Sequence, residues 1–384
     1  MDRIPTTHTG SLPRPADLDT MLVEQSRGED VAGVEERARA AIFDVVRLQA
    51  EAGVDLINDG EQGKPGYATY IRRRLTGFEG EVDTYISRRP EVEEHPDYAE
   101  RWRMLWANTA LRAPGCTGEI RVRDHDAVKR DLATLKEAAA QAGVDQDRLF
   151  LSAASPGVIA HFFPDRHYGN PDAYLAALAD AMKEEYRAIT EAGVLLQVDC
   201  PDLAMSRGGR FADLTLDEFR REVHRNVEAL NHALAGIPSD RVRMHLCWGN
   251  YEGPHTHDVD LGDIVDLVLE ASPSGISLEA ANPRHGHEWN VFEEVRLPDD
   301  RYLIPGVVDT TTNFVEHPDL VAQRLLNYAS VVGRERVQAG TDCGFGTFAG
   351  MQAVVPTVVW AKMRSIAEGA RRASQALWGS PAAV

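Results

Sequence analysis

Apolar and polar positions along this chain follow two different periods. Between residues 242 and 247, Val242, Met244 and Leu246 alternate with polar residues, which is the period-2 pattern of a β-strand. Elsewhere apolar residues recur every three or four positions, as on one face of an amphipathic helix. Two segments show this best: Leu175, Leu178, Met182, Tyr186 and Ile189 form one face, and Phe219, Val223, Val227, Leu230 and Leu234 form another. A further helix is expected at about residues 29–52.

A helix, a glycine and an apolar strand follow one another at several places. The tripeptide Ala-Gly-Val stands at 52–54, 142–144 and 192–194, and a glycine just past a helix readily takes the left-handed conformation that ends it. Strands alternating with helices indicate a parallel sheet, and eight such units fit a closed (β/α)8 TIM barrel. The rival, an open doubly wound sheet, lacks a Gly-x-Gly-x-x-Gly after an early strand. The eight strands are expected at about 3–7, 54–58, 149–153, 194–199, 241–247, 274–279, 301–308 and 336–341.

One long segment, from about residue 64 to 126, interrupts this alternation. It contains Trp102, Trp106 and the run Arg72 to Arg74. An insertion after the second strand would lie at the end of the barrel where active sites form. We therefore predict a single domain over residues 1–384, in which the insertion is a lid, a homodimer contact or a solvated excursion. The arginines would either receive an anionic group of a substrate or form a solvated face.

The charge and cysteine content restrict the partners and the compartment. The chain of 384 residues has 41 basic and 60 acidic side chains, a formal charge of -19, which argues against nucleic acid or an anionic membrane as partner. It shows neither an apolar signal segment nor a membrane-length apolar run. The four cysteines lack the spacing of a disulfide framework. We expect a soluble, cytoplasmic protein whose thiols are free to bind a metal.

Four residues at predicted strand ends suggest a metal site. His245 and Cys247 are two apart on a strand, so their side chains project from the same face. An imidazole and a thiolate held in this way are two typical zinc ligands. Glu279, in Ser-Leu-Glu-Ala-Ala-Asn, and Cys343, in Gly-Thr-Asp-Cys-Gly, follow later strands. The alternative is that both cysteines are buried and His245 is a hydrogen-bonded core residue; the four together favour zinc.

Two thiolate ligands point to a particular use of the zinc. They place charge on the metal and make it a poor Lewis acid for splitting water. They suit the binding of a substrate thiol, which the metal ionises although a free thiol, with a pKa of about 8.5, is mostly protonated at neutral pH. Glu279 would then be a fourth ligand that the substrate sulfur displaces.

Other polar residues at predicted strand ends have supporting roles. Glu61 and Asp199 would bind an ammonium group of the thiol, although Asp199 is also placed to cap a helix or a turn. The loop that contains Ser11 offers backbone N–H groups and a hydroxyl to a carboxylate, and Asp309 would face the same mouth. His255 and His285 belong to clusters with metal-like spacing, and we expect a pocket role rather than a second metal for them.

These motifs together resemble the catalytic barrel of the cobalamin-independent methionine synthases and their single-barrel relatives, the epoxyalkane:coenzyme M transferases. The resemblance implies that zinc binds the thiol sulfur and that Ser11, Glu61 and Asp199 hold the amino-acid end of homocysteine. The matching stretches are Thr6 to Arg14, Asp59-Gly60-Glu61, Gln197-Val198-Asp199, His245-Leu246-Cys247, Glu279 and Asp342-Cys343-Gly344.

The chain departs from the family pattern in three places. It has no room for the second barrel of the full synthases. Where the family has Asp-Glu-Pro, this chain has Asp199-Cys200-Pro201. Where the methionine synthases have Asp-Ile-His, it has Asp309-Thr310-Thr311, and the histidine of the family is thought to protonate the folate leaving group. Thr311 cannot serve as a general acid. Either His255 or His285 supplies the proton, or the electrophile is an epoxide, a methylated corrinoid or a sulfonium.

The leading prediction is a zinc-dependent thiol alkyltransferase that joins a small-molecule thiol and an alkyl donor, with methyl transfer to homocysteine via a zinc-bound thiolate. The first alternative is the addition of coenzyme M to an epoxide. A zinc hydrolase is disfavoured by the cysteine ligands. A non-catalytic zinc protein is disfavoured because the ligands come from separate strands around a substrate-sized mouth.

Overall fold

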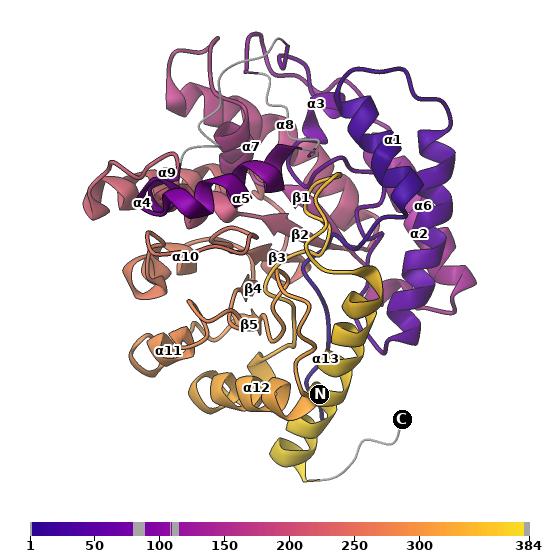
Figure 1. Ribbon diagram of the computed structural model, residues 1–384, viewed down its shortest axis with the longest axis vertical. Helices are drawn as coiled ribbons and strands as arrows, with labels where there is room; N and C mark the ends of the chain where they lie inside the picture. The colour runs from indigo at the N-terminus through magenta and orange to yellow at the C-terminus, as the bar shows by residue number, and fades with distance from the viewer. Residues whose placement is uncertain (1, 80–88, 108, 110–114, 380–384) are drawn as a thin grey trace.

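Five parallel strands form the centre of the molecule. The computed structural model describes residues 2–79, 89–107, 109 and 115–379. Its regular sheet has the strand order β1-β2-β3-β4-β5, and the strands follow one another down the view of Figure 1. They are β1 (Phe150–Ala154), β2 (Leu195–Asp199), β3 (Val242–His245), β4 (Gly275–Leu278) and β5 (Tyr302–Pro305).

Three further extended segments close this sheet into a ring of eight. They lie around Thr6, Ile57 and Ala339, and each pairs in parallel with a neighbour through isolated bridges. The (β/α)8 TIM barrel is therefore confirmed, but these three segments are not the regular strands that were predicted, because their pairings are isolated bridges and not continuous ladders. The backbone hydrogen bonds that join the segments run from Ile57 N–H to Arg148 O, Leu56 N–H to Thr6 O, Thr7 N–H to Ala339 O and Gln338 N–H to Leu303 O.

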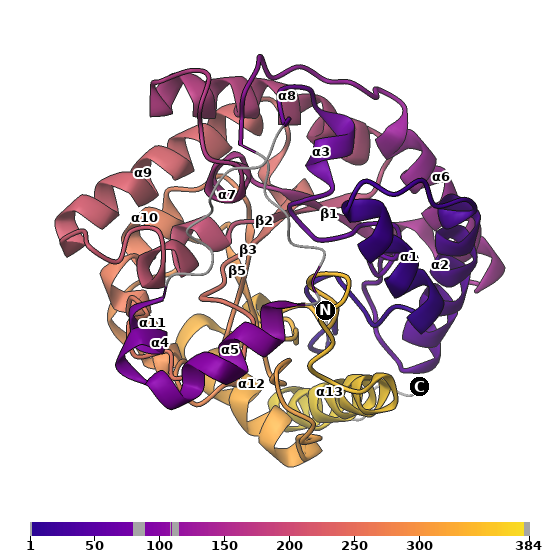
Figure 2. The same cartoon turned by 45° about the horizontal axis from the view of Figure 1, so that its top comes forward.

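The helices form an outer layer around the strands. Figure 2 shows them following one another around the barrel, and the predicted apolar faces of α8 and α9 are buried against it. The helix expected from residue 29 begins only at Val34, because Gly33 takes a left-handed φ of 80° and ends the preceding turn. In ring order the helices are α8 (Pro171–Glu191), α9 (Leu216–Ala233), α10 (Val265–Leu269), α11 (Val291–Glu294), α12 (Pro318–Val332), α13 (Pro356–Trp378), α2 (Val34–Glu51) and α6 (Ala127–Gln141).

The N-terminal segment of the chain is held against the C-terminal helix. The N-terminal segment runs beside α13, where the Ile4 N–H donates to Ser374 Oγ at 2.9 Å. The shorter helix α1 (Ala16–Ser26) packs against α2, and α7 (Pro156–Phe162) follows β1. No helix in the described part of the chain is long and apolar enough to cross a membrane.

The insertion after the second segment packs on the barrel rather than projecting into solvent. It forms α3 (Ile71–Arg74), α4 (Pro90–Glu94) and α5 (Pro96–Ala107). Val92 and Trp102 form an apolar cluster with Tyr251, which lies in the loop after β3. The run of arginines points toward α8 at Arg74, whose Nη1 forms an ion pair with Glu185 Oε2 at 2.9 Å. The insertion thus covers the barrel at the carboxyl end of β3, while its arginine run is directed away from this loop.

Candidate metal centre and substrate pocket

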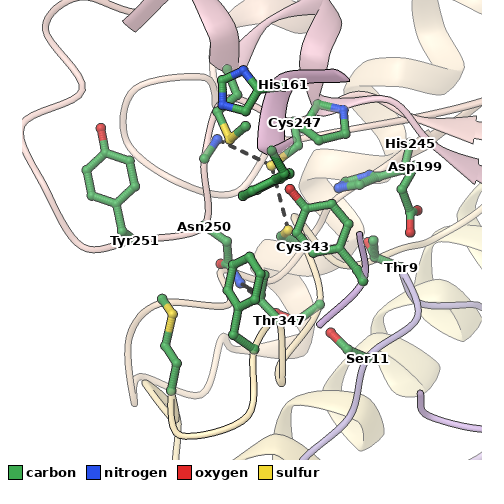
Figure 3. Close-up of a pocket in the computed structure, with 18 of the residues that line it drawn as sticks. Thr9, Ser11, His161, Asp199, His245, Cys247, Asn250, Tyr251, Cys343 and Thr347 are labelled. Atoms are coloured by element: carbon green, nitrogen blue, oxygen red, sulfur yellow. Dashed lines mark hydrogen bonds between the residues drawn. The ribbon is translucent and has the colours of Figure 1, made fainter. Parts of the chain in front are cut away.

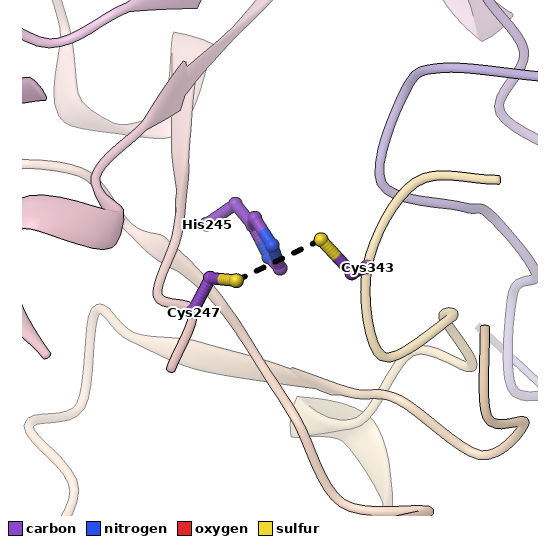
Figure 4. A group of neighbouring side chains, drawn as sticks. All are labelled: His245, Cys247 and Cys343. Atoms are coloured by element: carbon purple, nitrogen blue, oxygen red, sulfur yellow. Dashed lines mark hydrogen bonds between the residues drawn. The ribbon is translucent and has the colours of Figure 1, made fainter. Parts of the chain in front are cut away.

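Three of the four predicted metal ligands lie together at the mouth of the barrel. His245 is the last residue of β3, Cys247 stands two residues later, and Cys343 follows the segment around Ala339. One ligand atom from each lies within 4.8 Å of the others, and the two Sγ atoms are 3.7 Å apart (Figure 4). Two sulfurs bound at about 2.3 Å to one tetrahedral zinc ion would be about 3.8 Å apart. The observed spacing therefore fits such an ion.

His245 is oriented as a metal-binding histidine is. Its Nδ1 lies 3.3 Å from Ser277 Oγ on the neighbouring strand β4. Its Nε2 is buried and has no hydrogen-bond partner among the described residues. Burial lowers the pKa of His245 to about 3, so the ring is neutral, the form that binds a metal. A buried ring nitrogen without a partner is costly, and a metal ion here would satisfy it.

Glu279, the fourth predicted ligand, adjoins this group without joining it. It follows β4 directly, as predicted, and its carboxylate accepts hydrogen bonds from the Trp248 N–H at 2.8 Å and from Asn282 Nδ2 at 2.6 Å. Burial, and then the negative charge of Cys247, raise the pKa of Glu279. Its ligation therefore stays a prediction.

The three clustered residues line the same cavity as the predicted substrate-binding residues Ser11, Glu61 and Asp199 (Figure 3). Glu61 has a left-handed φ of 55°; its Oε1 accepts from the Ser152 hydroxyl, while its Oε2 is buried and without a described partner. Burial, and then the charge of Glu61, raise the pKa of Asp199. Two adjacent buried carboxylates of this kind favour a cationic ligand group, which would compensate their charge.

Ser11 is held against the Cys343 loop. The Gly346 N–H donates to Ser11 Oγ at 3.3 Å. A Cβ at Gly344 would lie only 2.0 Å from that hydroxyl oxygen, so glycine is required for this close approach. The loop at residues 9–11 and the Cys343 loop therefore form one wall.

The two histidines proposed as proton donors lie outside this cavity. His285 is bonded through Nδ1 to Glu288 at 2.8 Å and through Nε2 to Asp258 at 3.0 Å. Burial lowers its pKa, but these two bonds outweigh burial and raise it to about 10. His255 is bonded to Asp258 at 2.7 Å and to the Tyr251 carbonyl at 3.0 Å. Both rings thus hold loops in place, and a catalytic role for either stays a prediction.

Asp309 lines a second cavity, which also contains Glu279, His255 and Cys343. Its carboxylate accepts from the Thr311 N–H at 2.8 Å and from the Thr312 hydroxyl at 2.6 Å. These bonds hold residues 309–312 in a local turn around the Asp309 carboxylate. Asn250 belongs to the walls of both cavities and donates to the Gly344 carbonyl at 2.7 Å.

Several pocket residues were not predicted from the sequence. The insertion contributes Tyr67, Arg89, Trp102 and Trp106 to the cavity, and His161 and Arg210 come from the segments after β1 and β2. The four-residue spacing of the two tryptophans would have placed them on one helix face. For Arg89 no sequence signal exists, because its partner Tyr251 stands 162 residues away.

The fold and the clustered thiols and imidazole define a barrel protein with a candidate thiolate metal centre at its mouth. Residues 4–115 and 164–368 match the family described as "Cobalamin-independent synthase, Catalytic domain". The chain belongs to this family, which confirms the resemblance found in the sequence.

Relatives of known name share this family. A 2-hydroxypropyl-CoM lyase of Xanthobacter autotrophicus is 25% identical over 375 residues, which cover 89% of each chain. A methionine synthase of Saccharolobus solfataricus is 23% identical and covers 96% of this chain and 94% of the relative. The structure of a B12-independent methionine synthase from Shewanella sp. W3-18-1, in complex with selenomethionine, covers 98% of this chain and 100% of that chain with a TM-score of 0.74 and 20% identity. At this identity the structural likeness supports the fold.

Proposed function

We propose that this protein is a zinc-dependent thiol alkyltransferase that transfers a methyl group to homocysteine, as methionine synthases do. One observation carries the proposal: His245, Cys247 and Cys343 line the same cavity as the buried carboxylates of Glu61 and Asp199. A site for a soft metal and a site for an ammonium group therefore stand side by side. An amino-acid thiol such as homocysteine has both of the groups that they would bind.

The donor set fits zinc, which is bound in proteins by thiolates, imidazoles and carboxylates. His245, Cys247 and Cys343 would hold the ion, and Glu279 would be the fourth ligand that substrate sulfur displaces. Bound zinc would lower the pKa of the substrate thiol, so that the thiolate is present at neutral pH. Ser277 would keep the His245 ring in the orientation that directs Nε2 to the ion.

The remaining residues would orient the thiol and exclude water. Glu61 and Asp199 would bind the ammonium group, and the Ser11 hydroxyl with its neighbouring backbone N–H groups would bind the carboxylate. Trp102 and Trp106 of α5 line the other wall of the cavity and limit the access of solvent. Such a fixed, dry environment favours attack of a thiolate on an electrophilic carbon, because a desolvated nucleophile reacts faster.

A second candidate is the addition of a thiol to an epoxide, the reaction suggested by the name of the Xanthobacter relative. The threonine at position 311 favours it, since a threonine side chain offers no general acid for an amine leaving group. The carboxyl groups disfavour it, because a thiol without an ammonium group would leave Glu61 and Asp199 without a substrate group to bind. The homodimer and the single-domain organisation remain predictions.

A substrate screen with the zinc-loaded protein tests the proposal. Homocysteine and 2-mercaptoethanesulfonate would each be paired with methyltetrahydrofolate, methylcobalamin and a small epoxide, with Cys343→Ser as the control. Methionine that forms with the wild type and not with the control supports methyl transfer and identifies the donor. A thioether formed only with the epoxide moves the protein to the second candidate. No product from any pair, with one zinc bound per chain, refutes the proposed reaction.

A further inference from the structure

We propose that Arg89 forms an anion-recognising subsite in the substrate cavity, and that this subsite selects a substrate carrying a carboxylate or sulfonate. The inference rests on the proposed function, because it concerns the same cavity. It goes further by assigning a charge to a substrate whose identity the zinc site does not determine.

Arg89 is buried in the cavity wall although it carries a charge. It is 8% exposed and lines the cavity together with Trp102 and Tyr251. Its Nη1 donates to the Tyr251 hydroxyl at 3.3 Å, and its guanidinium lies 4.7 Å from the Tyr251 ring centroid and 5.9 Å from that of Trp102. The Tyr251 hydroxyl is the one hydrogen-bond acceptor that the guanidinium has among the described residues, so other N–H donors remain for an anionic ligand in the cavity.

Two glycines provide the space that the guanidinium occupies. A Cβ at Gly208 would lie 3.0 Å from Arg89 Nη1, and a Cβ at Gly249 would lie 3.2 Å from Nη2. Both contacts are tighter than ordinary van der Waals packing. The loops after β2 and β3 are therefore shaped to admit this side chain, which comes from the distant insertion.

Arg89 and the predicted ammonium site lie on different sides of the candidate metal centre. Arg89 contacts Tyr251. In Figure 3, Tyr251 lies to the left of Cys247 and Cys343, and Asp199 lies to the right. An anion bound at Arg89 would therefore lie apart from the predicted ammonium site.

Two carboxylates, those of Glu91 and Asp258, lie close to the proposed subsite, and Asp258 is already bonded to two histidine rings. The Tyr251 hydroxyl, which accepts from Arg89, donates to Glu91, and Glu91 is buried. Glu91 is thus already engaged by the hydroxyl. A ligand anion would bind the guanidinium from the cavity side, where planar nitrogen donors match carboxylate and sulfonate oxygens.

The anion bound at Arg89 would belong either to the alkyl donor or to the thiol. If the thiol is homocysteine, its ammonium and carboxylate groups are bound near Asp199 and Ser11, and the anion at Arg89 belongs to the alkyl donor. If the thiol has no ammonium group, its own anionic end is bound at Arg89. The shared chemistry is an oxyanion on a substrate that reaches the zinc site.

Calorimetric binding to the full-length zinc-loaded protein tests the subsite without turnover. Two pairs of probes differ mainly in charge: 2-mercaptoethanesulfonate against 2-mercaptoethanol, and methyltetrahydrofolate against the matching pterin without its glutamate. Arg89→Gln should weaken one charged probe about tenfold or more and its neutral counterpart less than about twofold. The charged probe that is affected identifies the substrate that carries the anion.

Two further variants make the result specific. Arg103→Gln, on the exposed surface of α5, should leave all four affinities unchanged. Gly208→Ala should weaken the same charged probe as Arg89→Gln, because its methyl group displaces the guanidinium without removing charge. Equal losses for charged and neutral probes, or no loss for either charged probe, would overturn the subsite. A charge-selective loss in a protein that forms no product would reject the proposed reaction and retain the subsite.

Discussion

Replacing Ser277 with alanine should weaken zinc binding without touching a predicted ligand. The Ser277 hydroxyl lies 3.3 Å from His245 Nδ1, and both side chains are buried. With zinc on Nε2, Nδ1 carries the proton and donates to this hydroxyl. Removal of the hydroxyl leaves the Nδ1 proton without a partner and the ring free to turn.

The separation of 3.3 Å determines the expected size of the effect. It is at the long end of N–H···O hydrogen bonds, so the bond should contribute in the lower part of the usual range of about 0.5–1.5 kcal/mol. Converted to affinity, this is a loss of about two- to fivefold. That is at or below the lower limit of about 10–100-fold found for residues that support metal ligands.

Competition with a chromogenic chelator at fixed pH would measure the zinc affinity. Ser274→Ala is the matched control, because Ser274 is also buried and precedes β4, yet makes no described contact with His245. The control should bind zinc as the wild type does. Equal affinities for wild type and Ser277→Ala, or equal losses in both variants, would refute the role given to Ser277 and to His245 Nε2.

Two further predictions concern buried charges. Lys362→Met should lower the free energy of unfolding by about 3–5 kcal/mol, because it leaves Glu316, 2.9 Å from Lys362 Nζ, buried and unpaired. Urea titration would measure this loss. As a control, Lys129→Met breaks the exposed pair with Asp126 and should cost below about 1 kcal/mol. Similar losses in both variants would contradict the prediction. Burial raises the pKa of Asp202 from 3.8 to about 6, so its contribution to stability is complete below pH 3.8 and is lost as pH rises through 6. Between pH 3.8 and 6 the unfolding free energy of Asp202→Asn should therefore fall by about 3 kcal/mol less than that of the wild type. Parallel curves of unfolding free energy against pH would contradict the prediction.

The barrel could be predicted because its strands and helices repeat a simple local pattern. Alternating apolar residues and the glycines at helix ends located all eight segments of the ring. The three segments around Thr6, Ile57 and Ala339 were overestimated as regular strands. Whether an extended segment forms a ladder or a single bridge depends on its neighbours in space, which the local sequence does not contain.

The candidate site was predicted where its residues stand at strand ends. His245 and Cys247 share one strand face, and the barrel brings Cys343 to them from about a hundred residues away. His255 and His285 have a spacing that suggests ligands, yet Asp258 binds both rings and holds them outside the cavity. The insertion was predicted to lie at the active-site end of the barrel, but its lining residue Arg89 could not be predicted, since it carries no motif and its partner is distant in sequence.

Zinc K-edge X-ray absorption on the zinc-loaded protein, before and after addition of homocysteine, tests the central claim most directly. With Cys247 and Cys343 as ligands, the spectrum should show two sulfur atoms at about 2.3 Å without homocysteine and three with it. The third sulfur should replace an oxygen, as expected if Glu279 is displaced. Fewer than two sulfurs at the start, or an unchanged count when homocysteine is bound, would contradict a zinc site that activates the substrate thiol.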